Sequence, residues 1–388
     1  GSYSRTIIGL MALFILFYIW HVGINFPMTG EMAKRYGGIQ QMPTTVRLVI
    51  SSVVVVVVGS FSYTLTRLKH RHELPVLLIV LLPTCFIATG PVSDNSGFIF
   101  LPALQIAQGV PLNEIYFQYD IFLSLLALAW TKAGLSMASI QTLGQLFFLL
   151  AILLTYIFSK KLFSSKTLSV AFLCTLLLIR LYAGPGETAA ELQGSPLRLD
   201  LWLILFGLVY LFGPFHWSLG VACGLLVIFH RNFGLIYSAA YLQLIAVLFC
   251  TSLADRNKST ELRTVVLQSI SKFGPTLLII IISMLLRNLY FGANTAADYY
   301  RSIGFGFTKI SPDSIYWYFP IIIATSAVLL AIYRKRFSQQ YYVVALFLIT
   351  LSIGNSLYFM GRSHEWNLLT LSISLLFTLF LFVDITWR

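Results

Sequence analysis

Residues 46–63 read VRLVISSVVVVVVGSFSY, an apolar run in which Arg47 is the one charged side chain. The basic residues Arg67, Lys69 and Arg71 follow within a few positions. A helix needs roughly 20 apolar residues to cross the hydrocarbon core of a bilayer. Lysine and arginine collect in the short loops on the cytoplasmic side of a membrane. This stretch therefore predicts a transmembrane helix that ends in a cytoplasmic loop.

The composition of the whole chain extends this prediction. Of 388 residues, 58% are apolar and only 10% are charged, with a mean hydropathy of +0.83. A soluble domain carries about 25% charged residues. The net charge of +12 comes from basic residues that cluster in short loops between apolar runs. We therefore expect a membrane protein with no separate soluble domain and no nucleic-acid partner.

Apolar runs recur along the chain and predict an all-α, polytopic integral membrane protein with about twelve crossings. These crossings are 7–25, 46–63, 75–90, 139–159, 167–183, 199–214, 216–229, 233–251, 268–288, 317–333, 340–358 and 367–387. The predicted organisation is a pair of N-terminal transmembrane helices (1–74) and a transmembrane module (75–388). The segment 213–216 (GPFH) divides two short crossings, which form either a tight hairpin or one long, broken helix.

The loops predict which side faces the cytoplasm. With twelve crossings and the N-terminus inside, the four basic loops all fall on the cytoplasmic side. These loops are 66–72, 159–161, 256–258 and 333–336. The opposite loops are longer, and the largest spans 91–138. Long loops in compact proteins are usually functional. Within this loop we expect two helices lying along the membrane surface, over 97–109 and 121–135.

The loop 91–138 also carries the motifs that suggest a family. Asp94 follows a predicted crossing, Gly97-Phe98 begins the first surface helix, and Gly109-Val110-Pro111 leads into the aromatic stretch 116–119 (YFQY). This order resembles the first external loop of the GT-C glycosyltransferases, and the likeness continues to the basic end of the crossing at 139–159. From the residues alone, Asp94 has a second interpretation, as part of a helix cap.

The resemblance implies that Asp94 is the general base of an inverting sugar transfer. It implies a polyprenyl-phosphate-linked sugar as donor and a lipid, glycan or protein as acceptor. Asn95 and Ser96 stand where a second acid is often found in that family. No cofactor is therefore certain, and a divalent cation (Mg²⁺ or Mn²⁺) stays open.

Cleavage of a phosphate-linked sugar requires groups that hold the phosphate. Arginine suits this role because its guanidinium stays charged and can bind two oxygens at once. The predicted phosphate-binding residues near the outer face are Arg198, Arg231, Arg301, Arg362 and His364. Arginines at a membrane interface can also simply extend to lipid headgroups.

A further set of polar and aromatic residues in the outer loops is predicted to shape the substrate site. They are Asn95, Tyr116, Gln118, Tyr119, Glu187, Glu191, Tyr299, Tyr300 and Trp366. Trp366 has an alternative role, because tryptophan is common at membrane interfaces.

Three functions follow from these observations. The leading one is a GT-C-type glycosyltransferase in a bacterial plasma membrane, with its active face towards the periplasm or the outside. The first alternative is a transporter or flippase of lipid-linked saccharides, which would place charges near the midplane of the membrane. The second is an O-antigen polymerase or ligase-type enzyme, which uses outer-face arginines but needs no acidic base. Asp94 therefore discriminates between the two enzymes.

Overall fold

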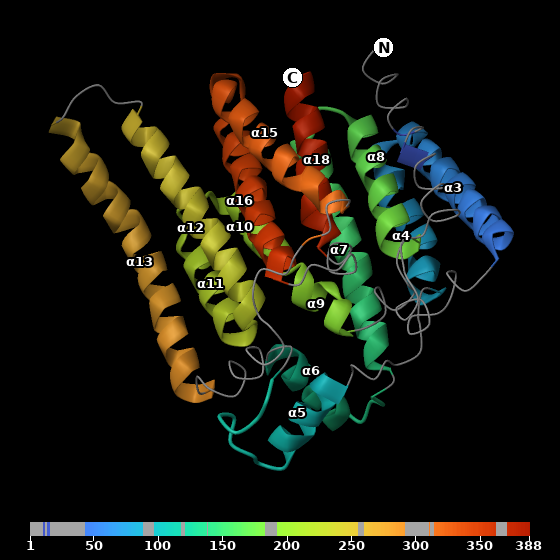
Figure 1. Ribbon diagram of the computed structural model, residues 1–388, viewed down its shortest axis with the longest axis horizontal. Helices are drawn as coiled ribbons and strands as arrows, with labels where there is room; N and C mark the ends of the chain where they lie inside the picture. Colours follow the sequence, from blue (N-terminus) through green and yellow to red (C-terminus); the bar gives the residue numbers. More distant parts are fainter. Residues whose placement is uncertain are drawn as a thin grey trace. The chain divides into compact units, whose positions relative to one another are not determined.

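The computed structural model describes most of the 388-residue chain and consists of helices and their connections. The described residues are 11, 14–15, 43–87, 97–117, 121–137, 139–182, 192–254, 260–291, 310, 314–361 and 371–388. All regular elements among them are helical, which confirms the predicted all-α class. Figure 1 shows these helices, coloured along the sequence. The chain divides into two compact units. Unit 1 comprises Gly1–Ser93, Ala138–Leu197 and Leu368–Arg388, and unit 2 comprises Asp94–Met137 and Arg198–Asn367.

Unit 1 is built around one helix that is buried over most of its length. Its described helices are α3 (Thr44–Arg67), α4 (His70–Ile87), α7 (Ile140–Leu162), α8 (Lys166–Leu177), the π-helix η4 (Leu178–Tyr182), the 3₁₀-helix η5 (Leu192–Gly194) and α18 (Ser372–Trp387). Helix α8 packs against α3, α7 and α18, and its residues 168–177 are all buried. A helix that is apolar on every face belongs in a core. Phe172 of α8 stacks on Phe377 of α18 with ring centroids 5.0 Å apart.

Unit 2 contains the other described helices, apart from one short helix that spans the boundary between the units. They are α5 (Gly97–Ala107), α6 (Ile121–Lys132), α10 (Trp202–Phe212), α11 (Trp217–Phe229), α12 (Arg231–Ala254), α13 (Thr260–Phe291), the 3₁₀-helix η6 (Ile315–Trp317), α15 (Tyr318–Ile332), the 3₁₀-helix η7 (Arg334–Arg336) and α16 (Gln339–Gly361). The short helix α9 (Pro196–Leu199) leads into α10. Helix α11 packs on α12 and α13, and α16 packs on α10, α12 and α15.

Two glycines let α11 approach α13 closely. A Cβ atom added to Gly220 would lie 2.9 Å from the Cα atom of Thr276, and one added to Gly224 would collide with the Ser283 hydroxyl. Small residues of this kind allow two helix backbones to pack at short range. The two glycines thus bring α11 and α13 into close contact.

The chain reverses direction between α10 and α11. Gly213 ends α10 with a φ of 80°, a backbone conformation that suits glycine. The Tyr237 hydroxyl of α12 donates to the Leu199 carbonyl just before α10. His230 is the single residue between the end of α11 and the start of α12. Since the start of α10 and the end of α11 both lie near the start of α12, the two short helices form a hairpin rather than one broken helix.

Five described helices are long and apolar enough to cross a membrane, which indicates a membrane protein. They are Thr44–Arg67, Ile140–Leu162, Asn232–Thr251, Phe273–Tyr290 and Gln339–Met360. Helices α10, α11, α15 and α18 have only 11 to 16 residues. At 1.5 Å per residue, such a helix is at most about 24 Å long, less than a hydrocarbon core of about 30 Å. The total of twelve crossings therefore stays a prediction.

The described helices coincide with most of the predicted elements. The predicted crossing at 7–25 falls largely outside the described residues, and each of the other eleven coincides with a helix. The stretches 97–109 and 121–135 form α5 and α6. Their predicted position along the membrane surface stays a prediction, as does the division of the chain at residue 74.

Candidate functional site

Most of the predicted site residues lie outside the described part of the chain. This holds for Asp94, Asn95, Gln118, Tyr119, Glu187, Glu191, Tyr299, Tyr300, Arg301, Arg362, His364 and Trp366. Arg198 and Tyr116 are described, and Arg231 is described as the first residue of α12. Tyr116 lies in the connection from α5 to α6 and is half-buried. Arg198 therefore provides the starting point for a site that can be described in atomic terms.

Arg198 is held in unit 2 by aromatic side chains. It lies in α9, where Pro196 occupies the first helical position that proline favours. Only 9% of the residue is exposed. Its Nη2 atom donates to the Tyr358 hydroxyl over 3.3 Å, and its guanidinium carbon lies 5.5 Å from the centre of the Phe233 ring. Arg198 thus connects α9 to the start of α12 and the end of α16.

Asp200 and Tyr237 extend this cluster. The Asp200 carboxylate is 3% exposed and accepts a hydrogen bond from the Trp202 indole over 3.2 Å. The buried Tyr237 hydroxyl donates over 2.6 Å to the carbonyl of Leu199, which stands between Arg198 and Asp200 in the chain. Since a buried charge is costly unless it is paired, a neighbouring carboxylate helps to stabilise the Arg198 guanidinium inside unit 2.

His230 is the most unusual member of the cluster. It links α11 to α12, is 1% exposed, and has no hydrogen-bond partner among the described residues at either ring nitrogen. Its ring lies 5.0 Å from that of Phe122 in α6. Burial and the positive charge of Arg198 together lower the pKa of His230 to about 3. The imidazole is therefore neutral at physiological pH.

We name the five residues Arg198, Asp200, His230, Tyr237 and Tyr358 the Arg198 cluster. Of the residues predicted from the sequence, only Arg198 belongs to it. The sequence did contain a signal for two others, because Asp200 lies two positions after Arg198 and His230 directly precedes Arg231. Tyr237 and Tyr358 lie inside apolar runs, where a single tyrosine gives no such signal.

A second polar network lies at one end of unit 1. The Glu73 carboxylate, at the start of α4, pairs with Lys160 of α7 and, over 2.6 Å, with Lys166 of α8. The Lys166 ammonium also donates to the Leu68 carbonyl over 2.7 Å. Burial alone would raise the pKa of Glu73, but the two lysines outweigh it and hold the pKa below its usual value. This network brings two of the four basic loops, 66–72 and 159–161, to the same end of unit 1.

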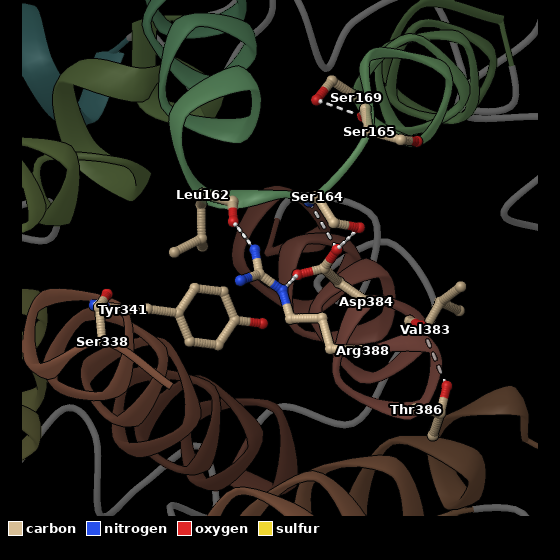
Figure 2. Close-up of polar contacts among 10 residues, drawn as sticks. All are labelled: Leu162, Ser164, Ser165, Ser169, Ser338, Tyr341, Val383, Asp384, Thr386 and Arg388. Carbon is tan, nitrogen blue, oxygen red and sulfur yellow. Dashed lines mark hydrogen bonds and ion pairs between the residues drawn. The ribbon is translucent and has the colours of Figure 1, made fainter. Parts of the chain in front are cut away.

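Asp384 completes that end of unit 1 (Figure 2). Its fully buried carboxylate accepts hydrogen bonds from the Ser164 backbone N–H over 2.7 Å and from the Ser164 hydroxyl over 2.6 Å. It also accepts a hydrogen bond from Arg388 over 2.8 Å, and Arg388 in turn donates to the Leu162 carbonyl over 2.8 Å. These contacts fasten the turn between α7 and α8 to the end of α18. Asp384 therefore has a structural role.

Arg180 lies near the opposite end of α8 from this network. It belongs to the π-helix η4, is 4% exposed, and lies over the Phe148 ring with 5.2 Å to its centre. Short π-helical segments are frequent at functional sites. Arg180 is thus a second buried arginine, within unit 1.

The described residues contain no group of three or more histidine, cysteine, aspartate or glutamate side chains that could hold a metal ion. Asp94, beside which a divalent cation could bind according to the sequence, is not among the described residues.

Comparison with known proteins identified no relative of this chain. None of the protein-family models, curated protein sequences and solved structures compared with the chain matches it. The evidence for its function therefore comes from the chain's own residues.

Proposed function

We propose that the protein is a GT-C-type membrane glycosyltransferase, which moves a sugar from a polyprenyl-phosphate donor to a lipid, glycan or protein acceptor. The reaction takes place at the non-cytoplasmic face of the membrane, in a bacterial cell the periplasmic face of the plasma membrane. The observation that carries the proposal is the buried guanidinium of Arg198 at one end of unit 2. A buried arginine in a lipid-facing protein is costly and therefore usually functional.

The place on α16 that Arg198 contacts supports a site at the outer face of the membrane. Arg198 binds Tyr358 near the end of α16, whereas Gln340 at its start donates to the Tyr210 carbonyl. These two positions on α16 are about 27 Å apart at 1.5 Å per residue, close to the thickness of a hydrocarbon core. The basic helix η7 directly precedes α16. If η7 faces the cytoplasm, as basic loops do, Arg198 lies towards the opposite face.

The proposed chemistry requires a base and a phosphate-binding group. The Asp94 carboxylate takes the proton of the acceptor hydroxyl as that oxygen attacks the anomeric carbon. The bond from this carbon to the phosphate oxygen breaks, and its electron pair leaves with the polyprenyl phosphate. Arg198 stabilises the charge that develops on the departing phosphate. Because the donor is a lipid, it reaches such a site sideways from the bilayer.

The remaining predicted residues keep their proposed roles. Arg231, Arg301, Arg362 and His364 contribute to phosphate binding, and the aromatic and polar residues of the outer loops shape the sugar site. The polymerase or ligase-type alternative draws on the same observation, because such an enzyme also holds its donor with outer-face arginines. The two enzymes differ in their need for Asp94.

The test is transfer of radiolabelled sugar from a panel of polyprenyl-phosphate sugars in liposomes. Loss of a general base typically costs 10²–10⁴-fold in rate, so we expect Asp94→Asn to lose at least about 100-fold. Glu114→Gln is the matched control, because Glu114 is an exposed carboxylate of the same loop. Full activity of Asp94→Asn would favour the polymerase or ligase-type enzyme. Absence of turnover by the wild type with every donor would favour the transporter.

A further inference from the structure

The buried imidazole of His230 has no hydrogen-bond partner among the described residues of unit 2. A neutral imidazole carries one donor and one acceptor, and buried groups of this kind are nearly always paired. Both ring nitrogens of His230 lack a partner among the described residues, although the residue is 1% exposed. Its ring contact with Phe122 is apolar. An apolar side chain would fill this place without leaving polar atoms unpaired. The arrangement therefore points to a ligand that binds the imidazole.

The surroundings of His230 indicate an anionic ligand. Phe233, three residues after His230, lies 5.5 Å from the Arg198 guanidinium, and the positive charge of Arg198 acts on the imidazole. His230 also immediately precedes the first turn of α12, a helix of 24 residues. The first N–H groups of a helix have no partner within the helix, and the helix dipole adds a partial positive charge there. A positive side chain, an imidazole N–H and a helix N-terminus together favour a negatively charged oxygen group.

The negative charge of Asp200 weakens the attraction of Arg198 for an anion. Its carboxylate acts on the same Tyr237 hydroxyl as Arg198, so it offsets part of the positive charge in the cluster. An anion that approaches Arg198 therefore gains less than it would beside an isolated arginine. A second donor of hydrogen bonds makes up for this loss, and His230 is suitably placed at the start of α12.

We propose that His230 and Arg198 together bind the phosphate of the lipid-linked donor at the N-terminus of α12, with the His230 ring donating an N–H to a phosphate oxygen. The identity of this ligand rests on the proposed function, whereas the binding itself requires no sugar transfer. The site recognises a phosphate group, which an inorganic phosphate ion or the headgroup of an ordinary membrane lipid also carries.

The test measures binding of a fluorescent short-chain polyprenyl phosphate to the detergent-solubilised protein, with the matching polyprenol as the phosphate-free probe. We expect His230→Phe to weaken binding of the phosphate probe about tenfold or more, which is the effect of losing about one good hydrogen bond. Binding of the polyprenol should not change. His230→Gln keeps an N–H donor and should bind within about threefold of the wild type. Inorganic phosphate should compete with the phosphate probe in the wild type and lose this effect in His230→Phe.

His216→Gln provides the matched control. His216 caps the start of α11, where its ring accepts from the Ser218 backbone N–H over 3.3 Å, and it lies outside the Arg198 cluster. This variant should bind the phosphate probe like the wild type. Thermal unfolding without ligand adds a second readout. Because His230→Phe removes two unpaired polar atoms, it should be at least as stable as the wild type.

Three results would overturn the assignment. The first is wild-type binding of the phosphate probe by His230→Phe. The second is an equal loss of polyprenol and phosphate binding, since that shows a general packing role. The third is displacement of the probe by phosphatidylglycerol as readily as by unlabelled polyprenyl phosphate, since that makes the site one for ordinary lipid headgroups.

The same variants separate this inference from the proposed function. If the wild type binds the phosphate probe through His230 but transfers no sugar from any donor, the inference stands and the glycosyltransferase proposal fails. If the wild type transfers sugar and His230→Phe binds and turns over donor normally, the glycosyltransferase proposal stands and the inference fails.

Discussion

Arg198 and Tyr358 are 160 residues apart in the sequence, and the guanidinium of the first donates a 3.3 Å hydrogen bond to the hydroxyl of the second. This contact joins Arg198 of α9 to the C-terminal part of α16. Phe233 of α12 lies against both residues, 5.5 Å from the Arg198 guanidinium and 4.7 Å from the Tyr358 ring. Three helices thereby hold one positive charge in a defined place.

Replacement of Arg198 should reduce sugar transfer. A hydrogen bond to a charged group is worth about 1.5–3 kcal/mol, so Arg198→Gln should lower kcat/KM by roughly 10- to 150-fold. Tyr358→Phe leaves the arginine in place and removes one hydrogen bond, so it should have a smaller effect, about threefold to tenfold. Arg336→Gln is the control, because Arg336 is exposed in η7 and lies over the Tyr333 ring. Equal activity of Arg198→Gln and Arg336→Gln would contradict a role for Arg198 in the reaction.

Glu73 should make the stability of the protein sensitive to acid. Its pKa in the folded protein lies below the usual value of 4.5, so the folded state favours the charged carboxylate. The resulting stabilisation is complete above the unfolded pKa and disappears as the pH falls through the folded pKa. Thermal unfolding of the wild type should therefore lose more stability between pH 7 and pH 3 than that of Glu73→Gln. Identical pH profiles of the two proteins would show that the pairing with Lys160 and Lys166 contributes nothing.

Asp384→Asn should lower stability without changing the chemistry. The substitution replaces a carboxylate that accepts from Ser164 and Arg388, and we expect a loss on the order of 1–3 kcal/mol. The control is Thr386→Ala, which removes an exposed hydroxyl that bonds only within its own helix. Thermal unfolding measures the first effect, and sugar transfer per folded molecule measures the second. A transfer rate that falls while stability is unchanged would argue against a structural role.

Gly220→Ala should destabilise the packing of α11 on α13. The added methyl group would lie 2.9 Å from the Thr276 backbone, and overpacking of this kind typically costs about 1–3 kcal/mol. Gly59→Ala in α3 is the matched control, because a Cβ atom there meets nothing within 4 Å. Alanine is the better helix former by up to about 1 kcal/mol, so the control should be neutral or stabilising. Chemical denaturation of both variants gives the comparison, and a neutral Gly220→Ala would mean that the two helices can move apart at little cost.

The positions of most described helices could be predicted from the apolar runs of the sequence. The predicted crossings 216–229 and 340–358 differ from α11 and α16 by at most three residues at either end. Such accuracy has a physical reason, because apolar side chains and backbone hydrogen bonds within one helix are local properties of the chain. The motif around Arg198 was also visible, since charged residues between apolar runs stand out.

The contacts between residues far apart in the sequence could not be predicted before the fold was known. The Asp384 carboxylate pairs with Arg388, four residues away in the sequence, but it also accepts from Ser164, which is 220 residues away. The sequence places His230 next to Arg231, but only the fold shows that both of its ring nitrogens are buried without a partner among the described residues. The hairpin at Gly213 likewise depends on where Tyr237 binds. Contacts of this kind depend on how helices pack, and many packings satisfy the same apolar pattern because lipid and protein interiors are similarly apolar.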